Sequence, residues 1–198
     1  MDYDELLKYV RSECRVRVHK DRSVVSGTRG TFQVTDSGPL ITVAQKGLPK
    51  KKLTETLIHE YGHYLQHKDG FMSYIDGICD SYTVAAEWFA GRIELSDFEL
   101  QVVRNGMLVI EYDAERRAHQ FGLDFNVKNF TSSYYLKGAA AYMDCIKWTF
   151  LRRVCTSETP CRKSYEPRLL TNEELFAPLG AKKIALMDAC FNLQTYPG

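Results

Sequence analysis

Residues 56–67 constrain this chain more than any other segment, because they place a His-Glu-x-x-His motif inside an apolar helical pattern. On a helix, His59 and His63 lie one turn apart and point in the same direction, so both can bind one metal ion. Glu60 follows His59 directly and lies within reach of a water molecule on that ion. The spacing therefore predicts a metal-dependent hydrolase.

The motif lies in a segment for which we expect a helix. Pro49 suits a first helical turn. Apolar residues then recur at helical spacing, namely Leu53, Leu57, Ile58, Tyr61, Tyr64 and Leu65. A glycine costs about 1 kcal/mol relative to alanine inside a helix, so Gly62 indicates that another backbone or the metal site packs closely there. The alternative is a half-buried helix with hydrogen-bonded histidines, in which the motif is a coincidence.

Composition places the chain among globular proteins. It has 198 residues, 44% hydrophobic residues and a net charge of +1, which fits one domain or a domain with an appendage. We find no apolar run of about 18 residues that could span a membrane and no signal-peptide pattern at the acidic start. The six cysteines form no Cys-x-x-Cys pair, so we expect reduced thiols and a cytoplasmic protein. The charge gives no indication of a nucleic-acid or membrane partner.

The pattern along the chain predicts an α+β fold. Alternating residues at 15–19, 30–34 and 40–44 favour strands, and we expect a small antiparallel sheet before the motif helix. The later residues favour helices, and Ser96-x-x-Glu99 and Thr171-x-x-Glu174 are capping boxes that mark helix starts. We expect residues 1–154 to form the domain that carries the motif, and residues 155–198 to form a helical C-terminal extension of unknown role.

A catalytic zinc ion usually has three protein ligands, so the motif needs one more. His67 lies about 12 Å along the helix axis from His59 at 1.5 Å per residue, so a straight helix keeps it from the same ion. A carboxylate from another helix is the remaining option. Glu111 and Glu87 are the candidates, and Glu111 is preferred.

Glu111 is favoured because of the residues that follow it. Glu115 and His119 continue its stripe at one-turn intervals, and an outer carboxylate such as Glu115 can orient a ligating imidazole. Ala114 and Ala118 would let two helices approach closely. The alternative is a solvated acidic face stabilised by charge pairs along the helix.

The pattern His-Glu-x-Gly-His-x-x-x-His, followed by Glu111-x-Asp113-Ala114-Glu115-x-x-Ala118, resembles the gluzincin zinc peptidases. Within that group, it resembles the ImmA/IrrE-type intracellular peptidases and the soluble minigluzincins. The resemblance covers roughly residues 40–121. It implies one Zn²⁺ per chain and a zinc-dependent endopeptidase that acts on a protein or peptide substrate.

The resemblance also implies a role for each residue of the motif. His59, His63 and Glu111 would be zinc ligands, Glu60 the general base, and Glu115 the support of one histidine. A peptidase also needs a donor for the oxyanion. His119, Tyr134 and Tyr135 are candidates by chemical type alone, and each has a structural role as its alternative.

Two other functions are compatible with the same residues. The chain could keep the zinc site but act as a protein-binding or regulatory module without proteolysis, with a regulatory protein as partner. It could also be a helical protein without catalysis, in which His59, His63 and Glu111 do not converge.

Overall fold

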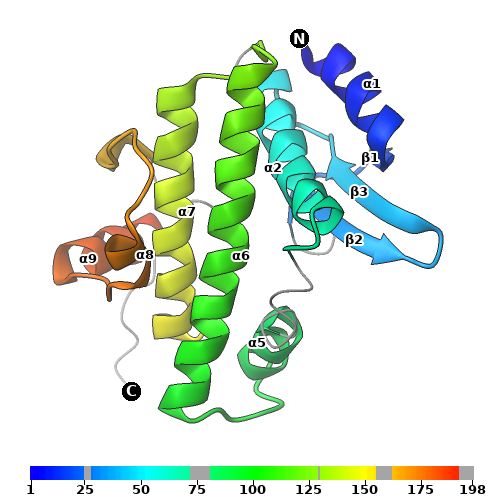
Figure 1. Cartoon of the computed structure of the whole chain (residues 1–198). Helices are drawn as coiled ribbons and strands as arrows, with labels where there is room; N and C mark the ends of the chain where they lie inside the picture. The colour runs from blue at the N-terminus through cyan, green and yellow to red at the C-terminus, as the bar shows by residue number, and fades with distance from the viewer. Residues whose placement is uncertain (25–27, 72–80, 129, 155–161, 192–198) are drawn as a thin grey trace. The chain divides into compact units, whose positions relative to one another are not determined.

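The computed structural model describes residues 1–24, 28–71, 81–128, 130–154 and 162–191. Their elements, in chain order, are α1 (Tyr3–Glu13), β1 (Arg15–His19), β2 (Gly30–Thr35), β3 (Gly38–Ala44), α2 (Lys50–Lys68), α5 (Ser81–Phe89), α6 (Asp97–Asp124), α7 (Ser132–Arg152), the 3₁₀ helix η1 (Arg162–Ser164), α8 (Asn172–Phe176) and α9 (Ala181–Cys190) (Figure 1). A small sheet near the N-terminus is followed by helices, so the predicted α+β class is confirmed.

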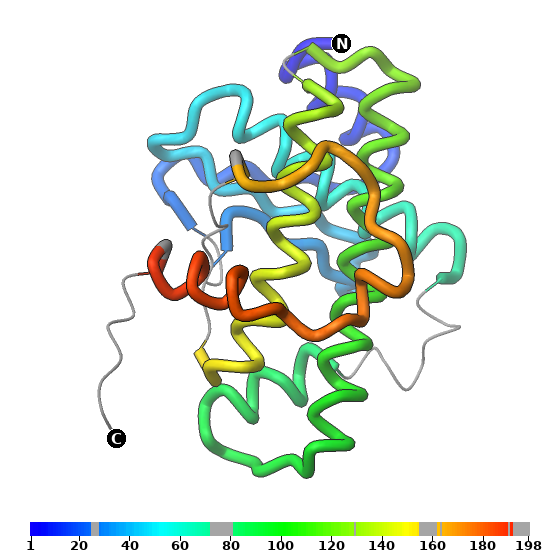
Figure 2. Tube along the Cα trace, turned by 90° about the vertical axis from the view of Figure 1, so that its left-hand side faces the viewer, coloured from blue at the N-terminus to red at the C-terminus, as the bar shows by residue number. Residues whose placement is uncertain are grey.

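The chain divides into two compact units. The first comprises Met1–Tyr74 and Asp113–Tyr135, and the second comprises Ile75–Tyr112 and Leu136–Gly198. This division does not follow the predicted boundary at residue 154, which stays a prediction. Leu175 of α8 joins a buried cluster with Met143 of α7, and Met187 of α9 joins another with Trp148 of α7. Figure 2 shows α9 beside α7, within the second unit.

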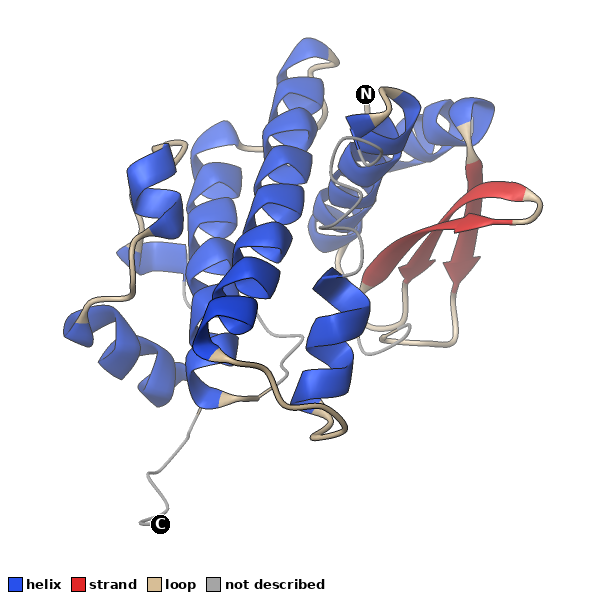
Figure 3. Ribbon diagram, turned by 60° about the horizontal axis from the view of Figure 1, so that its bottom comes forward, coloured by secondary structure: helices blue, strands red, loops and turns tan. Residues whose placement is uncertain are grey.

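The sheet lies in the first unit and is mixed rather than antiparallel (Figure 3). The strand order is β1-β3-β2, with β1 parallel to β3 and β2 antiparallel to β3. The prediction of an antiparallel sheet was wrong because the chain reverses twice between β1 and β3, so these two strands run the same way. The arrangement puts β3 in the centre, and its apolar residues Leu40, Ile41, Val43 and Ala44 are all buried.

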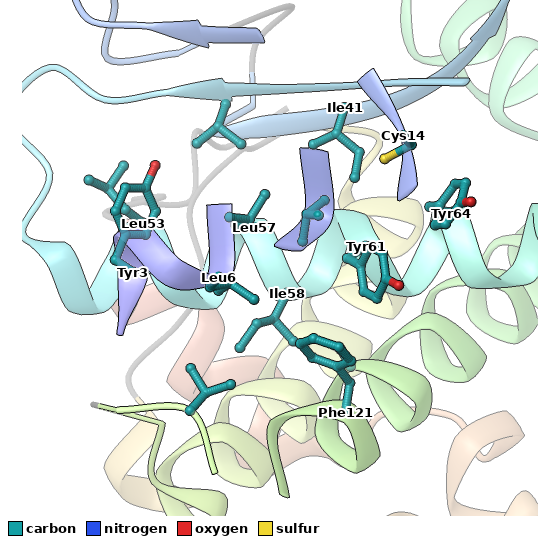
Figure 4. Close-up of a cluster of buried hydrophobic side chains, with 14 of the residues drawn as sticks. Tyr3, Leu6, Cys14, Ile41, Leu53, Leu57, Ile58, Tyr61, Tyr64 and Phe121 are labelled. Atoms are coloured by element: carbon teal, nitrogen blue, oxygen red, sulfur yellow. The ribbon is translucent and has the colours of Figure 1, made fainter. Parts of the chain in front are cut away.

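The core of the first unit fixes the rotation of α2 about its axis. Its apolar side chains pack against α1, the sheet and the C-terminal part of α6 (Figure 4). The cluster includes Leu53, Leu57, Ile58 and Tyr61 of α2, Leu6 of α1, Ile41 of β3 and Phe121 of α6. Full burial of one such side chain stabilises the fold by about 1.5–3 kcal/mol. Because this face is held inward, His59 and His63 are held on a neighbouring face.

The helix starts follow the capping chemistry read from the sequence. The Ser96 N–H donates to Glu99 Oε2 at 2.8 Å before α6, and Thr171 and Glu174 cap each other at the start of α8. Both predicted capping boxes are confirmed. Asp2 and Glu5 form a third box at the start of α1. Within the described ranges, no helix is long and apolar enough to cross a membrane.

Candidate metal centre

Two histidines and one glutamate come together on α2 and α6. One ligand atom from each of His59, His63 and Glu111 lies within 4.8 Å of the others, so this group could hold a metal ion. The two imidazole rings are 4.9 Å apart, as expected for residues one helical turn apart. Glu111 is only 4% exposed. It lies two residues before Asp113, the first residue of α6 that belongs to the first unit.

The donor set fits zinc better than it fits magnesium or calcium, because imidazole nitrogens are ligands of borderline metals. Ligands held about 2.1 Å from one tetrahedral zinc ion lie about 3.4 Å apart. The three ligand atoms lie within 4.8 Å of one another, so their separations close by no more than about 1.4 Å on binding.

The approach of α2 to α6 depends on Gly62. A Cβ atom on Gly62 would lie 2.4 Å from the carbonyl oxygen of Ala114, which is closer than real contacts allow. The sequence-based expectation that another backbone packs against this glycine is confirmed. Ala114 and Ala118 are both completely buried. The small residues on each helix therefore bring the backbone of α6 against the turn of α2 that carries both histidines.

A chain of hydrogen bonds fixes the tautomer of His63. Gln66 Nε2 donates to Asp113 Oδ2 at 3.0 Å, and this bond turns Gln66 Oε1 toward His63 Nδ1 at 2.9 Å. An amide oxygen can only accept, so Nδ1 of His63 carries the proton and Nε2 keeps its lone pair. Asp113 is itself held by Arg117 Nε at 2.6 Å. His63 is thereby prepared as a ligand through Nε2.

Glu115 has the corresponding position beside His59. Its Oε1 atom lies 3.2 Å from His59 Nδ1, and Glu115 is 8% exposed. An ionised carboxylate favours a proton on the facing nitrogen, which leaves Nε2 of His59 for a metal. The sequence placed Glu115 behind one of the two histidines, and the structure places it beside His59.

Two residues around the group were missed from the sequence. Tyr82 of α5 donates a hydrogen bond from its hydroxyl to Glu111 Oε1. A donor in this position restricts the rotation of the Glu111 carboxylate. Gln66 could have been found, because it follows His63 by three residues and therefore shares its helix face. Tyr82 lies 29 positions from Glu111, and no local pattern connects them.

Glu60 lies on α2 under the start of β2. It is 6% exposed, and a Cβ atom on Gly30 would lie 2.8 Å from both Glu60 Cγ and Glu60 Oε1. The backbone of Gly30 therefore covers one side of the Glu60 carboxylate. The same Cβ atom would lie 2.6 Å from Thr56 Cγ2, so a residue with a side chain at position 30 would displace both Thr56 and Glu60.

The three oxyanion candidates have structural contacts of their own. His119 Nε2 lies 2.7 Å from Ser132 Oγ, and burial lowers the pKa of His119 while Glu115 raises it by a smaller amount. The Tyr134 ring lies under the Lys51 ammonium group at 3.7 Å. Tyr135 is 5% exposed and belongs to the apolar core of the first unit. These contacts do not assign any of the three to an oxyanion.

The other two ligand candidates are engaged elsewhere. Glu87 forms a bidentate pair with Arg92, through Nε at 2.5 Å and Nη2 at 2.7 Å, and this pair lowers the pKa of Glu87. The carboxylate that joins the two histidines is that of Glu111. The His67 ring lies 5.9 Å from the Phe32 ring of β2, and His67 is not part of the group.

Comparisons with protein-family models, curated proteins and solved structures found no match to this chain. The resemblance to the gluzincin peptidases therefore rests on the motif residues themselves. The function has to be argued from the chemistry of the site.

Proposed function

We propose that this chain is a zinc-dependent endopeptidase with His59, His63 and Glu111 as zinc ligands. The observation that supports it best is the convergence of these three residues, with both imidazoles arranged to offer Nε2. Three protein ligands leave a fourth position for water or substrate, as in catalytic zinc sites. A purely structural zinc site usually has four protein ligands.

A zinc ion bound to this group would act as a Lewis acid on a peptide carbonyl and would lower the pKa of a coordinated water to about 7. Glu60 takes a proton from the attacking water as the new carbon–oxygen bond forms. It then delivers that proton to the amine nitrogen as the carbon–nitrogen bond breaks. The buried position of Glu60, against the backbone of Gly30, limits the number of water molecules that compete for this carboxylate.

The residues behind the ligands have positioning roles. Gln66 and Glu115 hold the proton on Nδ1 of His63 and His59, so that each ring offers Nε2. Tyr82 holds the Glu111 carboxylate in place. The proposal includes an intracellular location and a protein or peptide substrate. The thiol of Cys14, which is not in a disulfide, is consistent with a reducing compartment.

The first test is metal content. Protein purified without chelators is expected to contain one zinc ion per chain by elemental analysis. The double variant His59→Ala/His63→Ala is expected to contain none. Absence of zinc from the wild-type protein, together with no uptake from micromolar zinc, would refute the metal site.

The second test separates a peptidase from a binding module. Zinc-loaded protein is incubated with a peptide library, and new peptide termini are identified by mass spectrometry. Glu60→Gln is expected to abolish all new termini while zinc is retained. Glu55→Gln is the matched control, because Glu55 is a glutamate on the same helix with similar burial, 7% against 6% exposed. New termini that persist in Glu60→Gln, or none in the wild-type protein, would overturn the peptidase.

A further inference from the structure

A second surface of the first unit, beside strand β1, is rich in arginine. The outer side of β1 borders a hollow of about 490 Å³, lined by Arg11, Cys14, Arg15, Val16, Arg17 and Leu40. The sheet order is β1-β3-β2, so β1 is an edge strand of the described sheet. The opposite edge strand, β2, is the one that lies against Glu60. This surface, the β1 edge, is therefore separate from the metal centre.

The backbone of β1 has hydrogen-bonding groups that face outward. The His19 carbonyl accepts a hydrogen bond from Gln45 N–H, on the β3 side. The N–H and C=O groups of one residue point to the same side of a strand, and the side alternates from residue to residue. Val16 and Val18 therefore direct theirs away from β3. Within the described part of the chain, these groups have no hydrogen-bond partner, and such an edge can pair with another strand.

The side chains at this edge carry an unbalanced positive charge. Arg11, Arg15 and Arg17 are exposed, and no ion pair involves them among the described residues. Arg15 Nη1 donates to the Ser37 carbonyl at 3.2 Å, so one N–H of its guanidinium group points toward the turn between β2 and β3. Arg15 and Arg17 are two positions apart, so they share one face of the strand about 7 Å apart.

We propose that the β1 edge binds an extended acidic peptide segment of a partner protein, which adds to the sheet as a fourth strand. The outward groups of Val16 and Val18 would pair with its backbone. Carboxylates at every second position of the segment have the same spacing as Arg15 and Arg17, and Arg11 adds a third positive charge at the rim. Val16 and Leu40 supply an apolar floor for the hollow.

Charge also argues against a second copy of this chain as the occupant. If two β1 edges paired antiparallel, Arg15 and Arg17 of one copy would face the same arginines of the other. Like charges opposite each other destabilise a strand pair. An acidic segment forms favourable ion pairs at the same positions. The charges of Arg15 and Arg17 therefore favour an acidic strand over a second copy of β1.

The test measures fluorescence anisotropy of a labelled peptide, Glu-Val-Glu-Val-Glu-Val-Glu, with the full chain. The double variant Arg15→Glu/Arg17→Glu is expected to weaken binding at least about tenfold, and Arg15→Gln/Arg17→Gln by a smaller factor. Lys128→Glu/Lys182→Glu makes the same change in net charge at exposed lysines outside the hollow, and it is expected to bind normally. Equal loss in both reversal variants would overturn the site.

Strand addition has its own signature. Only one alternating set of peptide N–H groups can face β1, so two N-methylated peptides are compared, one for each set. Binding is expected to be lost with one and retained with the other. Equal binding of the two would refute strand pairing. Displacement of the peptide by millimolar inorganic phosphate would instead indicate a small-anion site. A wild-type dimer that the arginine variants dissociate would indicate self-association, and either result would overturn the proposal.

The β1 edge and the metal centre can fail independently. Binding of the acidic peptide is expected to be unchanged in Glu60→Gln and after removal of zinc with a chelator. Loss of binding in either condition would contradict a separate site. A chain without peptidase activity could still bind the segment, and a peptidase could lack this second site.

Discussion

Substitution of Gly62 by alanine tests whether the approach of α2 to α6 determines the metal site. The added Cβ would lie 2.4 Å from the Ala114 carbonyl oxygen, about 1 Å short of an ordinary contact at 3.4 Å. The obstacle is backbone rather than a flexible side chain. The helices must therefore separate by about that distance or tilt locally, and Glu115 and Glu111 move with α6.

We expect Gly62→Ala to change folding stability only slightly and zinc affinity more strongly. Alanine raises intrinsic helix stability by about 1 kcal/mol, while overpacking costs about 1–3 kcal/mol, so the free energy of unfolding of the zinc-free protein falls by no more than about 2 kcal/mol. In a bound site the metal–ligand distances stay within about 0.2 Å of their usual values, so a shift of the α6 backbone by about 1 Å must be made up by strain in the ligand side chains. We therefore expect zinc affinity to fall at least about tenfold, beyond what the change in stability explains.

The assay is a competition titration with a chromophoric zinc chelator, together with urea unfolding of the zinc-free protein. Gly180→Ala is the control, because a Cβ there meets nothing within 4 Å and the residue has an ordinary φ of −71°. Unchanged zinc affinity in Gly62→Ala would refute the reasoning. So would a gain in stability of the full 1 kcal/mol that helix propensity predicts.

Three further predictions concern single residues. Gln66→Met removes the acceptor of His63 Nδ1 and is expected to weaken zinc binding about 10–100-fold in the same titration. Tyr82→Phe frees the Glu111 carboxylate to rotate and is expected to weaken zinc binding about tenfold. An unchanged zinc affinity would contradict the positioning role of Tyr82. Burial raises the pKa of the Cys14 thiol to about 11. Because the thiolate is the reactive form, iodoacetamide labelling of Cys14, followed by peptide mass spectrometry, should accelerate about tenfold per pH unit from pH 7 to 9. From the thiolate fractions alone, it should stay about 300-fold slower at pH 7 and about 80-fold slower at pH 9 than in unfolded protein, whose thiol pKa is about 8.5.

The sequence was most informative where one local pattern determined both the helix and its chemistry. The spacing of His59 and His63 predicted the helix and the shared direction of the rings. The stripe from Glu111 to Glu115 predicted which face of α6 would meet them. Both inferences used a period of 3.6 residues, which holds for any α-helix. The capping boxes were equally local and were confirmed for the same reason.

Contacts between segments far apart in the sequence could not be predicted from such local patterns. Alternation in residues 15–19 identifies a strand but does not identify its neighbour, and the parallel pairing of β1 with β3 was therefore not predictable from that alternation. Tyr82 reaches Glu111 from another helix and left no periodic signal. The division into units also depends on packing, because α8 and α9 bury Leu175 and Met187 with α7.

Gly30 gives the N-terminal sheet an unexpected sensitivity to substitution. Its φ is not in the left-handed region, so the position requires small volume rather than backbone freedom. In a saturation survey scored by zinc-dependent hydrolysis, replacements at Gly30 should lower activity because the added side chain displaces Glu60. Exposed neighbours on the same strand, such as Gln33, should tolerate most residues. Gly30 has no reactive group, yet its intolerance to substitution would then identify the position that packs against Glu60.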